Sequence, residues 1–187
     1  MTRWAPGAEG RLHDAALELF LENGFAATTV PQIAERAGLT TRSFFRYFAD
    51  KREVLFTGEE ELPGVVARMF DEADEGLTPL EMAHQGLRTV VFPRLLSFRD
   101  GLVVRRRIVQ SDDGLREREL RKLAILHDAA SAALLRRGVP PLEAEIAGRL
   151  SVMVYDTTLE LWLAEDAVGS LDDILDTVMA TVTRLSA

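Results

Sequence analysis

Hydrophobic residues recur every three or four positions along nearly the whole chain, which is the spacing of amphipathic helices. In the first such stretch Leu12, Ala16 and Leu19 fall on one face, and Asn23-Gly24 ends the pattern with a pair suited to a helix C-terminus. Period-two runs of β-branched residues, which predict strands, are nearly absent. The pattern therefore predicts an all-α fold, and we expect about nine helices.

Two short helices follow the first. The apolar positions place them at residues 30–37 and 41–48, with Gly38-Leu39-Thr40 between them. Thr29 is placed to cap the first of the two, and Pro31 falls in its first turn, where a missing N–H breaks no hydrogen bond. Glycine in the connecting turn permits positive φ or a close approach of the helices. Two helices joined in this way have the proportions of a helix-turn-helix.

The second of these helices has two chemically different faces. Phe44 and Phe48 are spaced to point inward, into the core of the segment. The outward positions are polar, basic or aromatic: Thr41, Arg42, Phe45 and Arg46. Arginine reads guanine edges in the major groove of DNA, and hydroxyl groups hydrogen-bond to phosphates. The outward face therefore favours a DNA-reading helix.

The rest of the chain predicts longer helices separated by strong helix-breaking signals. Lys51 opens a fourth helix that Gly58 and Pro63-Gly64 should interrupt or kink. Residues 78–81, Thr-Pro-Leu-Glu, form a capping box with proline at the first helical position. Pro140-Pro141 marks a further stop.

Composition excludes several functional classes. The 187 residues are 47% apolar and 28% charged, which is the balance of a folded globular chain. A chain without cysteine has no disulfide, thiol nucleophile or thiolate metal site, and no pair of its three histidines has helical metal-ligand spacing. No apolar run is long enough to span a bilayer, and residues 1–10 lack a signal-peptide core. We expect a cytoplasmic protein with no cofactor, no metal, no catalytic residue and no membrane partner.

The net charge of −8 at first argues against a nucleic-acid partner, because phosphate binding is mostly electrostatic. The charge is unevenly distributed, however. Residues 53–187 carry a net −9, whereas residues 1–52 carry a net +1. Within residues 36–52 there are five basic side chains and one acid, Asp50. A small positive face on an acidic body is compatible with local DNA binding.

These residues resemble the DNA-binding domain of the TetR family. The resemblance rests on Gly24-Phe25, on the run from Thr29 to Thr40, on residues 44–48 (Phe-Phe-Arg-Tyr-Phe) and on Lys51. It covers about residues 10–56 and implies a helix-turn-helix domain at residues 1–52, followed by a ligand-binding and dimerisation bundle at residues 53–187. The motif at residues 44–48 and the run Arg105-Arg106-Arg107 are also similar to members that bind acyl-CoA-like ligands.

The resemblance implies a dimeric, sequence-specific regulator, most simply a repressor that a small and mostly hydrophobic ligand releases from a near-palindromic operator. By position, Thr29, Tyr47 and Lys51 should contact phosphates. The residues implied to face the groove are Thr40, Thr41, Arg42, Ser43 and Arg46. Phe45 stands where the family mostly has tyrosine, so we expect it to pack against a DNA sugar or a thymine methyl group.

The body of the chain offers a dimer face and a ligand pocket. The predicted helix at residues 142–164 is apolar on two sides, one for the subunit core and one for a partner, and residues 170–186 repeat the pattern. A monomer core is the alternative. Candidate ligand contacts are polar or aromatic groups on apolar helices: Phe92, Arg106, His127, Met153, Tyr155 and Trp162. Each has a plain structural alternative as a core, interface or solvated residue.

Three other functions remain open at this stage. An enzyme is disfavoured because the sequence has no phosphate-binding glycine loop and no metal triad, and Asp156 with Glu160 has the pattern of a surface stripe. An activator or nucleoid-type binder without an effector would differ in ligand-sensitive footprinting. A protein-interaction module that reuses the helix-turn-helix is disfavoured by the basic outer face of the third helix.

Overall fold

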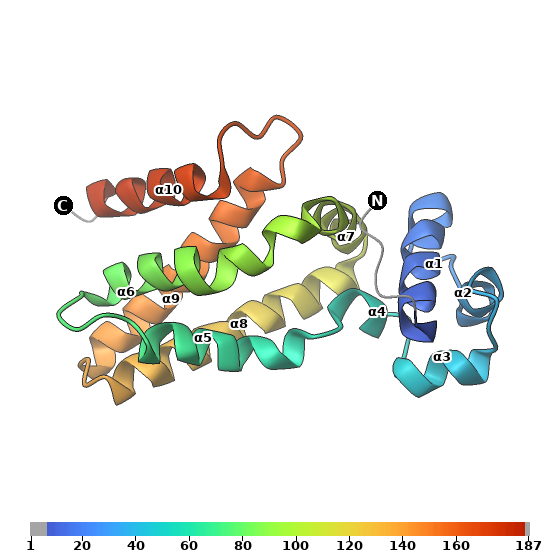
Figure 1. Cartoon of the computed structure of the whole chain (residues 1–187), viewed down its shortest axis with the longest axis horizontal. Coiled ribbons are helices and arrows are strands. Elements are labelled where there is room, and N and C mark those ends of the chain that lie inside the picture. The colour runs from blue at the N-terminus through green and yellow to red at the C-terminus, as the bar shows by residue number, and fades with distance from the viewer. Residues whose placement is uncertain (1–6, 186–187) are drawn as a thin grey trace. The chain divides into compact units, whose positions relative to one another are not determined.

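A computed structural model describes residues 7–185, and in that part of the chain every regular element is helical, which confirms the predicted all-α fold. The α-helices there number ten, one of them a single turn, close to the nine expected (Figure 1). Their bounds are α1 Ala8–Asn23, α2 Val30–Arg36, α3 Thr41–Tyr47, α4 Glu53–Phe56, α5 Leu62–Asp71, α6 Pro79–Gly86, α7 Arg99–Gln110, α8 Asp113–Arg136, α9 Pro141–Trp162 and α10 Leu171–Leu185. Within these residues no helix is long and apolar enough to cross a membrane.

The chain divides into two compact units. The first contains the described residues up to Glu59 together with Phe98–Leu120, and the second contains Glu60–Ser97 and the described residues from Arg121 onward. From the sequence we predicted a domain boundary after residue 52. In the structure, the first unit also includes α4, α7 and the start of α8. The reason is the core, since Ile108, Val109 and Leu115 pack with the residues of α1 and α3.

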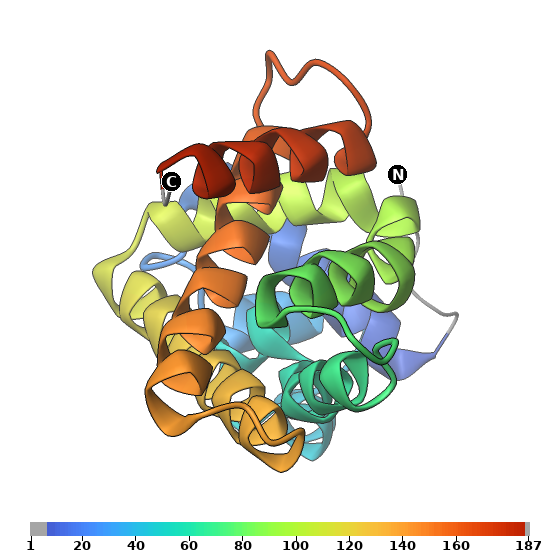
Figure 2. The ribbon, with the colours of Figure 1, turned by 90° about the vertical axis from the view of Figure 1, so that its left-hand side faces the viewer.

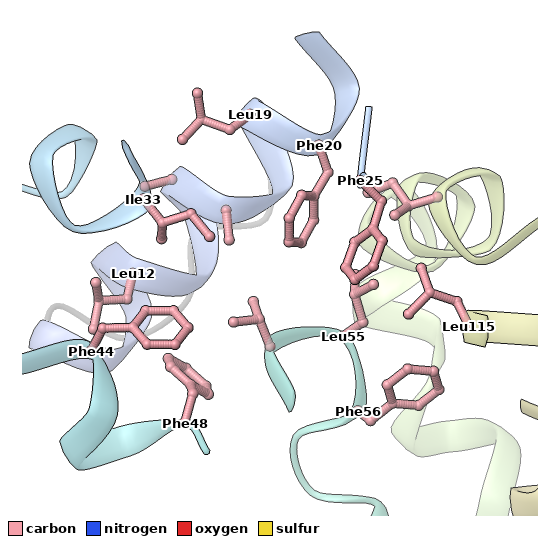
Figure 3. Packing of buried hydrophobic residues seen from close by; sticks show 14 of the residues in the cluster. Leu12, Leu19, Phe20, Phe25, Ile33, Phe44, Phe48, Leu55, Phe56 and Leu115 are labelled. Carbon is pink, nitrogen blue, oxygen red and sulfur yellow. The ribbon is translucent and has the colours of Figure 1, made fainter. Parts of the chain in front are cut away.

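The core of the first unit is built from aromatic and aliphatic side chains of six helices, α1, α2, α3, α4, α7 and α8. Figure 3 shows Phe44 of α3 and Phe48, the residue after α3, directed toward Leu12 of α1, and Phe20 beside Phe25. The ring centroids of Phe44 and Phe48 are 5.3 Å apart, within the range of favourable ring contacts. This shared core fixes the orientation of α3 relative to α1, and therefore decides which side chains of α3 face outward.

The segment predicted as one interrupted helix forms two elements. Helix α4 ends at Phe56, and α5 begins at Leu62 after Gly58, whose φ is +82°. A residue with a side chain is strained in that conformation, so glycine permits the break. The predicted interruption at Gly58 thus falls where the chain passes from the first unit to the second.

The second unit is a helical bundle in which α10 packs against α9. Figure 2 shows α10 (red) lying across α9 (orange). The buried side of α10 consists of Leu171, Ile174, Leu175, Val178 and Val182. Helices α8 and α9 meet closely at Gly148, where an added Cβ would lie 2.3 Å from the hydroxyl oxygen of Ser131. Glycine is therefore required for this approach.

Candidate nucleic-acid interface and interior cavity

Reciprocal hydrogen bonds fix the start of α2. The backbone N–H of Thr29 donates to Oε1 of Gln32 at 2.8 Å, and the N–H of Gln32 donates to the Thr29 hydroxyl at 3.5 Å. This is a capping box, with Pro31 in the first turn as the sequence indicated. The Thr29 side chain is exposed beside this helix N-terminus, where the free N–H groups favour an anion.

The turn between α2 and α3 has the conformation that its residues predict. Gly38 has φ +67°, and the N–H of Leu39 donates to the carbonyl of Ala34 at 2.8 Å, closing the end of α2. Thr40 then caps α3, because the N–H of Ser43 donates to its hydroxyl at 3.1 Å. The two helices are thereby held as a helix-turn-helix with little freedom at the turn.

Helix α3 presents one buried and one exposed face. Phe44 and Phe48 are buried, while Phe45 is 58% exposed, an unusual state for so large an apolar ring. The remaining outward positions are Thr41, Arg42, Arg46 and Tyr47, all of them exposed. An exposed aromatic ring among arginines and hydroxyl groups is the surface expected of an element that inserts into a DNA groove.

Two residues of this outer face support each other. The guanidinium group of Arg46 donates to the Tyr47 hydroxyl at 2.7 Å and lies 4.7 Å from the centroid of its ring. Arg42, in contrast, has no hydrogen-bond or ion-pair partner among residues 7–185. Its guanidinium group is therefore available to a base edge or a phosphate.

Other basic residues of the segment are engaged within the protein. Arg36 forms hydrogen bonds with Glu22 at 2.8 and 3.0 Å and with Glu18 at 3.3 Å. The hydrogen bond to Glu22 is the main reason why the pKa of Arg36 is raised, and the same bond lowers the pKa of Glu22. Arg36 therefore serves to hold α2 on α1.

Lys51 has partners that its sequence position did not predict. We expected it to contact a phosphate, but its ammonium group donates to the carbonyl oxygens of Phe25 at 2.6 Å, Ala26 at 3.2 Å and Thr28 at 2.9 Å. The ammonium also lies 4.4 Å from the centroid of the Phe25 ring. Burial is the main cause that lowers the pKa of Lys51. A phosphate would have to compete with three carbonyls for this group.

The second unit contains a small, partly open cavity of about 40 Å³. Helices α5, α8 and α9 and the π-helical segment Leu87–Val91, which extends α6, all contribute to its wall. The lining residues are Leu62, Val65, Val66, Met69, Phe70, Leu87, Val91, Leu126, Ala130, Ser151, Val152 and Tyr155. Of the six residues that the sequence offered as ligand contacts, Tyr155 lies in this wall.

The other five candidates lie elsewhere. Phe92 and Trp162 are buried, and Met153 is exposed on the outer side of α9. Arg106 belongs to the first unit. His127 is engaged between helices, with its Nε2 atom 3.1 Å from the Ser131 hydroxyl and 3.2 Å from a Glu145 carboxylate oxygen. The sequence did not single out the lining residues of α5, because apolar residues at helical spacing look the same in a core and in a pocket wall.

Arg105, the first arginine of the run in α7, is also bound by groups of the protein itself. Arg105 donates to the carbonyl of Leu55 at 2.7 Å and contacts the carboxylates of Glu59 at 3.0 Å and Glu119 at 2.7 Å. Its guanidinium carbon lies 4.9 Å from the centroid of the buried Phe56 ring. Arg105 therefore ties α4 to α7 and α8 inside the first unit.

An apolar strip covers the outer side of α9. We call it the α9 outer face, and its large exposed residues are Leu142, Ile146, Met153 and Leu161. In the last helix, which the sequence offered as a second part of the dimer face, Leu175 and Val178 are buried within the chain, whereas Leu185 is 77% exposed. The α9 outer face is therefore an apolar surface that a partner could cover.

Comparisons with known proteins agree with this geometry. The family model described as "Bacterial regulatory proteins, tetR family" matches residues 12–57, the stretch that contains the helix-turn-helix. The transcriptional regulator TtgR of Pseudomonas putida is 29% identical over 91% of this chain and 87% of its own length. The first curated relatives are 38–39% identical, and the match spans little more than a third of their length.

Solved structures of the same fold cover nearly the whole chain. A SmeT–triclosan complex superposes with a TM-score of 0.65 and 23% identity, over 93% of this chain and 90% of that one. The repressor FadR of Thermus thermophilus with lauroyl-CoA gives a TM-score of 0.57 and 23% identity, over 94% and 93%. Those two proteins bind very different molecules, so the shared fold does not decide the ligand of this chain.

Proposed function

We propose that this chain, which belongs to the TetR family of bacterial transcriptional regulators, is a repressor that binds operator DNA as a homodimer and is released by a small apolar ligand. The observation that carries the proposal is the outer face of α3. Its exposed Arg42, Phe45 and Arg46 stand on a short helix whose orientation is fixed by a capped turn and a buried aromatic core.

In this proposal α3 enters the major groove. Arg42 reads a guanine edge, while Phe45 packs against a sugar or a thymine methyl group. Thr40, Thr41 and Ser43 face the groove from the helix N-terminus, and the neighbouring hydroxyls of Thr29 and Tyr47 bind backbone phosphates. The three carbonyl partners of Lys51 support a structural role for that residue.

The α9 outer face supports the dimer. Its exposed leucine, isoleucine and methionine side chains form a stripe that a second copy of the same face would cover, as in a two-fold symmetric interface. A two-fold dimer places two α3 helices in successive major grooves about 34–36 Å apart, so the target should be a near-palindrome.

The second-unit cavity supports the release step. Ligand binding that favours a DNA-incompetent state weakens operator affinity, typically by about 5–150-fold, and operator DNA weakens ligand binding by the same factor. We assign Tyr155 to the ligand site because it lines the cavity.

Selection of operator sequences from random DNA tests the proposal, followed by titration of the selected site. We expect Arg42→Ala to cost about 1–3 kcal/mol of binding free energy and to relax specificity at one base pair in each half-site. Arg42→Lys is the matched control, since it keeps the charge but not the bidentate geometry, and it should restore phosphate attraction without the base preference. Failure to enrich any sequence, or an unchanged titration with Arg42→Ala, would contradict the assignment.

A further inference from the structure

The wall of the second-unit cavity has an unusual chemical uniformity. Its twelve lining residues include no charged side chain, no histidine and no amide. The lining residues with a hydroxyl group are Ser151 and Tyr155, and the Ser151 hydroxyl donates to the carbonyl of Ala147 at 2.7 Å. The site therefore offers apolar contact area and neutral hydrogen-bonding groups.

An anionic ligand fits this wall poorly. A carboxylate or phosphate that leaves water for an apolar cavity loses its hydration, and that loss is not repaid without a cation or several N–H donors. The sequence offered two cationic candidates, Arg106 and His127, and neither lines the cavity. His127 instead lies between Ser131 and Glu145.

The size of the cavity depends on one flexible side chain. A volume of about 40 Å³ holds only about three water molecules, so a ligand can enter only if part of the wall moves. Met69 is the wall residue best suited to move, because methionine has three rotatable side-chain bonds and adapts to irregular gaps.

Gly86 gives Met69 its present position. A Cβ added at Gly86 would lie 1.7 Å from Cγ of Met69 and 2.9 Å from its sulfur, so the methionine occupies the space that a side chain at residue 86 would need. Any residue larger than glycine there must displace Met69, and the cavity that Met69 lines is empty space into which it can move.

We propose that the second-unit cavity takes a small, uncharged, largely apolar molecule, and that Met69, seated against Gly86, is the gate that sets how large this molecule can be. The inference rests on the proposed function for its regulatory meaning, but it concerns ligand chemistry alone. It predicts that a molecule whose charged group must enter the cavity is not a ligand of this chain.

Calorimetric titration of the protein without DNA tests whether the cavity excludes charged ligands. The probes are 1-naphthol and 1-naphthoate, which share a ring system and differ in charge at neutral pH. We expect 1-naphthol to bind and 1-naphthoate to bind at least about 100-fold more weakly, because the carboxylate must be desolvated. Equal or tighter binding of 1-naphthoate, or no binding of 1-naphthol, would overturn the inference.

Three variants test the gate. Met69→Ala should improve binding of the larger neutral probe 1-hydroxypyrene relative to 1-naphthol, since it removes the mobile part of the wall. Gly86→Ala should weaken 1-naphthol binding by about tenfold or more, and the double variant should regain it, because only the 3.0 Å contact with Cβ of residue 69 remains. Unchanged probe preference in Met69→Ala refutes the gate, and this result decides the question even if Gly86→Ala does not fold.

Operator titration of the same samples separates this inference from the proposed function. If the operator binds but no neutral probe does, the ligand class is wrong and the DNA-binding function stands. If 1-naphthol binds and no DNA sequence is ever enriched, the cavity assignment stands and the proposed function fails.

Discussion

Replacement of Lys51 by methionine distinguishes two roles for that residue. Methionine keeps much of the apolar stem and removes the ammonium group. The structure gives this group three carbonyl acceptors, on Phe25, Ala26 and Thr28, at distances of 2.6, 3.2 and 2.9 Å. These carbonyls lie in the loop between α1 and α2, so Lys51 joins the end of the helix-turn-helix to the loop that precedes it.

The magnitude follows from the contacts that are lost. Hydrogen bonds from a charged donor contribute about 1.5–3 kcal/mol each when measured singly, but bonds that share one donor group are not additive. The cation–π contact with Phe25 adds about 0.5–1 kcal/mol. The cost of burying the ammonium, which lowers its pKa, offsets part of this gain. We expect Lys51→Met to lower the free energy of unfolding by about 2–4 kcal/mol.

Urea denaturation and salt-dependent operator titration measure the two roles separately. If Lys51 serves only to hold the three carbonyls, Lys51→Met should lose about 2–4 kcal/mol of unfolding free energy. The slope of log operator affinity against log salt concentration should then stay unchanged. A phosphate contact predicts little change in stability and a slope shallower by about 0.9 per subunit. Arg52→Met removes the same charge next to Lys51 and should alter stability by less than about 0.5 kcal/mol. If Lys51→Met is as stable as Arg52→Met, the structural role is refuted.

Three further predictions address the dimer, the pH dependence and the arginine network. Ile146→Asp, at a position 50% exposed on the α9 outer face, should yield a folded monomer in sedimentation, whereas Leu175→Asp, at a fully buried position, should unfold the chain; a dimeric Ile146→Asp protein would contradict the α9 interface. Burial lowers the pKa of His13 from 6.5 despite the opposing effect of Asp14. The unfolded chain therefore binds a proton first, and the free energy of unfolding should fall as pH decreases below 6.5 toward the lowered pKa, a dependence that His13→Gln should weaken in urea titrations. Arg105→Met should destabilise the first unit by about 2–4 kcal/mol, since it leaves two carboxylates and a carbonyl without their cation. The same variant should bind 1-naphthol as tightly as the unmodified protein does. Weaker binding would indicate that α7 contributes to the ligand site.

The helix-turn-helix was predictable because its signals are local. Thr29 with Gln32, Gly38, and Thr40 with Ser43 are pairs or single residues whose effect is decided within one helical turn. The inward position of Phe44 and Phe48 also follows from helical spacing alone. Such features can be predicted from the sequence, because they do not depend on residues far away along the chain.

The cavity was not predictable in the same way. Its walls come from four separate segments between Leu62 and Tyr155, and nothing in the local pattern of α5 separates a wall residue from a core residue. Gly86 shows the difficulty, since its importance appears only when Met69, seventeen positions earlier, is seen against it. The protein partners of Lys51 and Arg105 were not predictable either, because each side chain is held by acceptors many residues away.

The charge that reaches DNA is smaller than the sequence count implies, and this difference can be measured. Residues 36–52 contain five cations, but Arg36 is paired with Glu22 and Lys51 is committed to carbonyls, which leaves Arg42, Arg46 and Arg52. Because Arg42 is assigned to a guanine edge, Arg46 and Arg52 remain for phosphates. Two such cations in each subunit of a dimer predict a salt slope of about −4, at roughly −0.9 per neutralised phosphate. Titration of the operator across a series of salt concentrations gives this slope directly. A slope of about −9 would mean that all five cations of each subunit reach phosphates, and that Arg36 and Lys51 exchange their protein partners for DNA on binding.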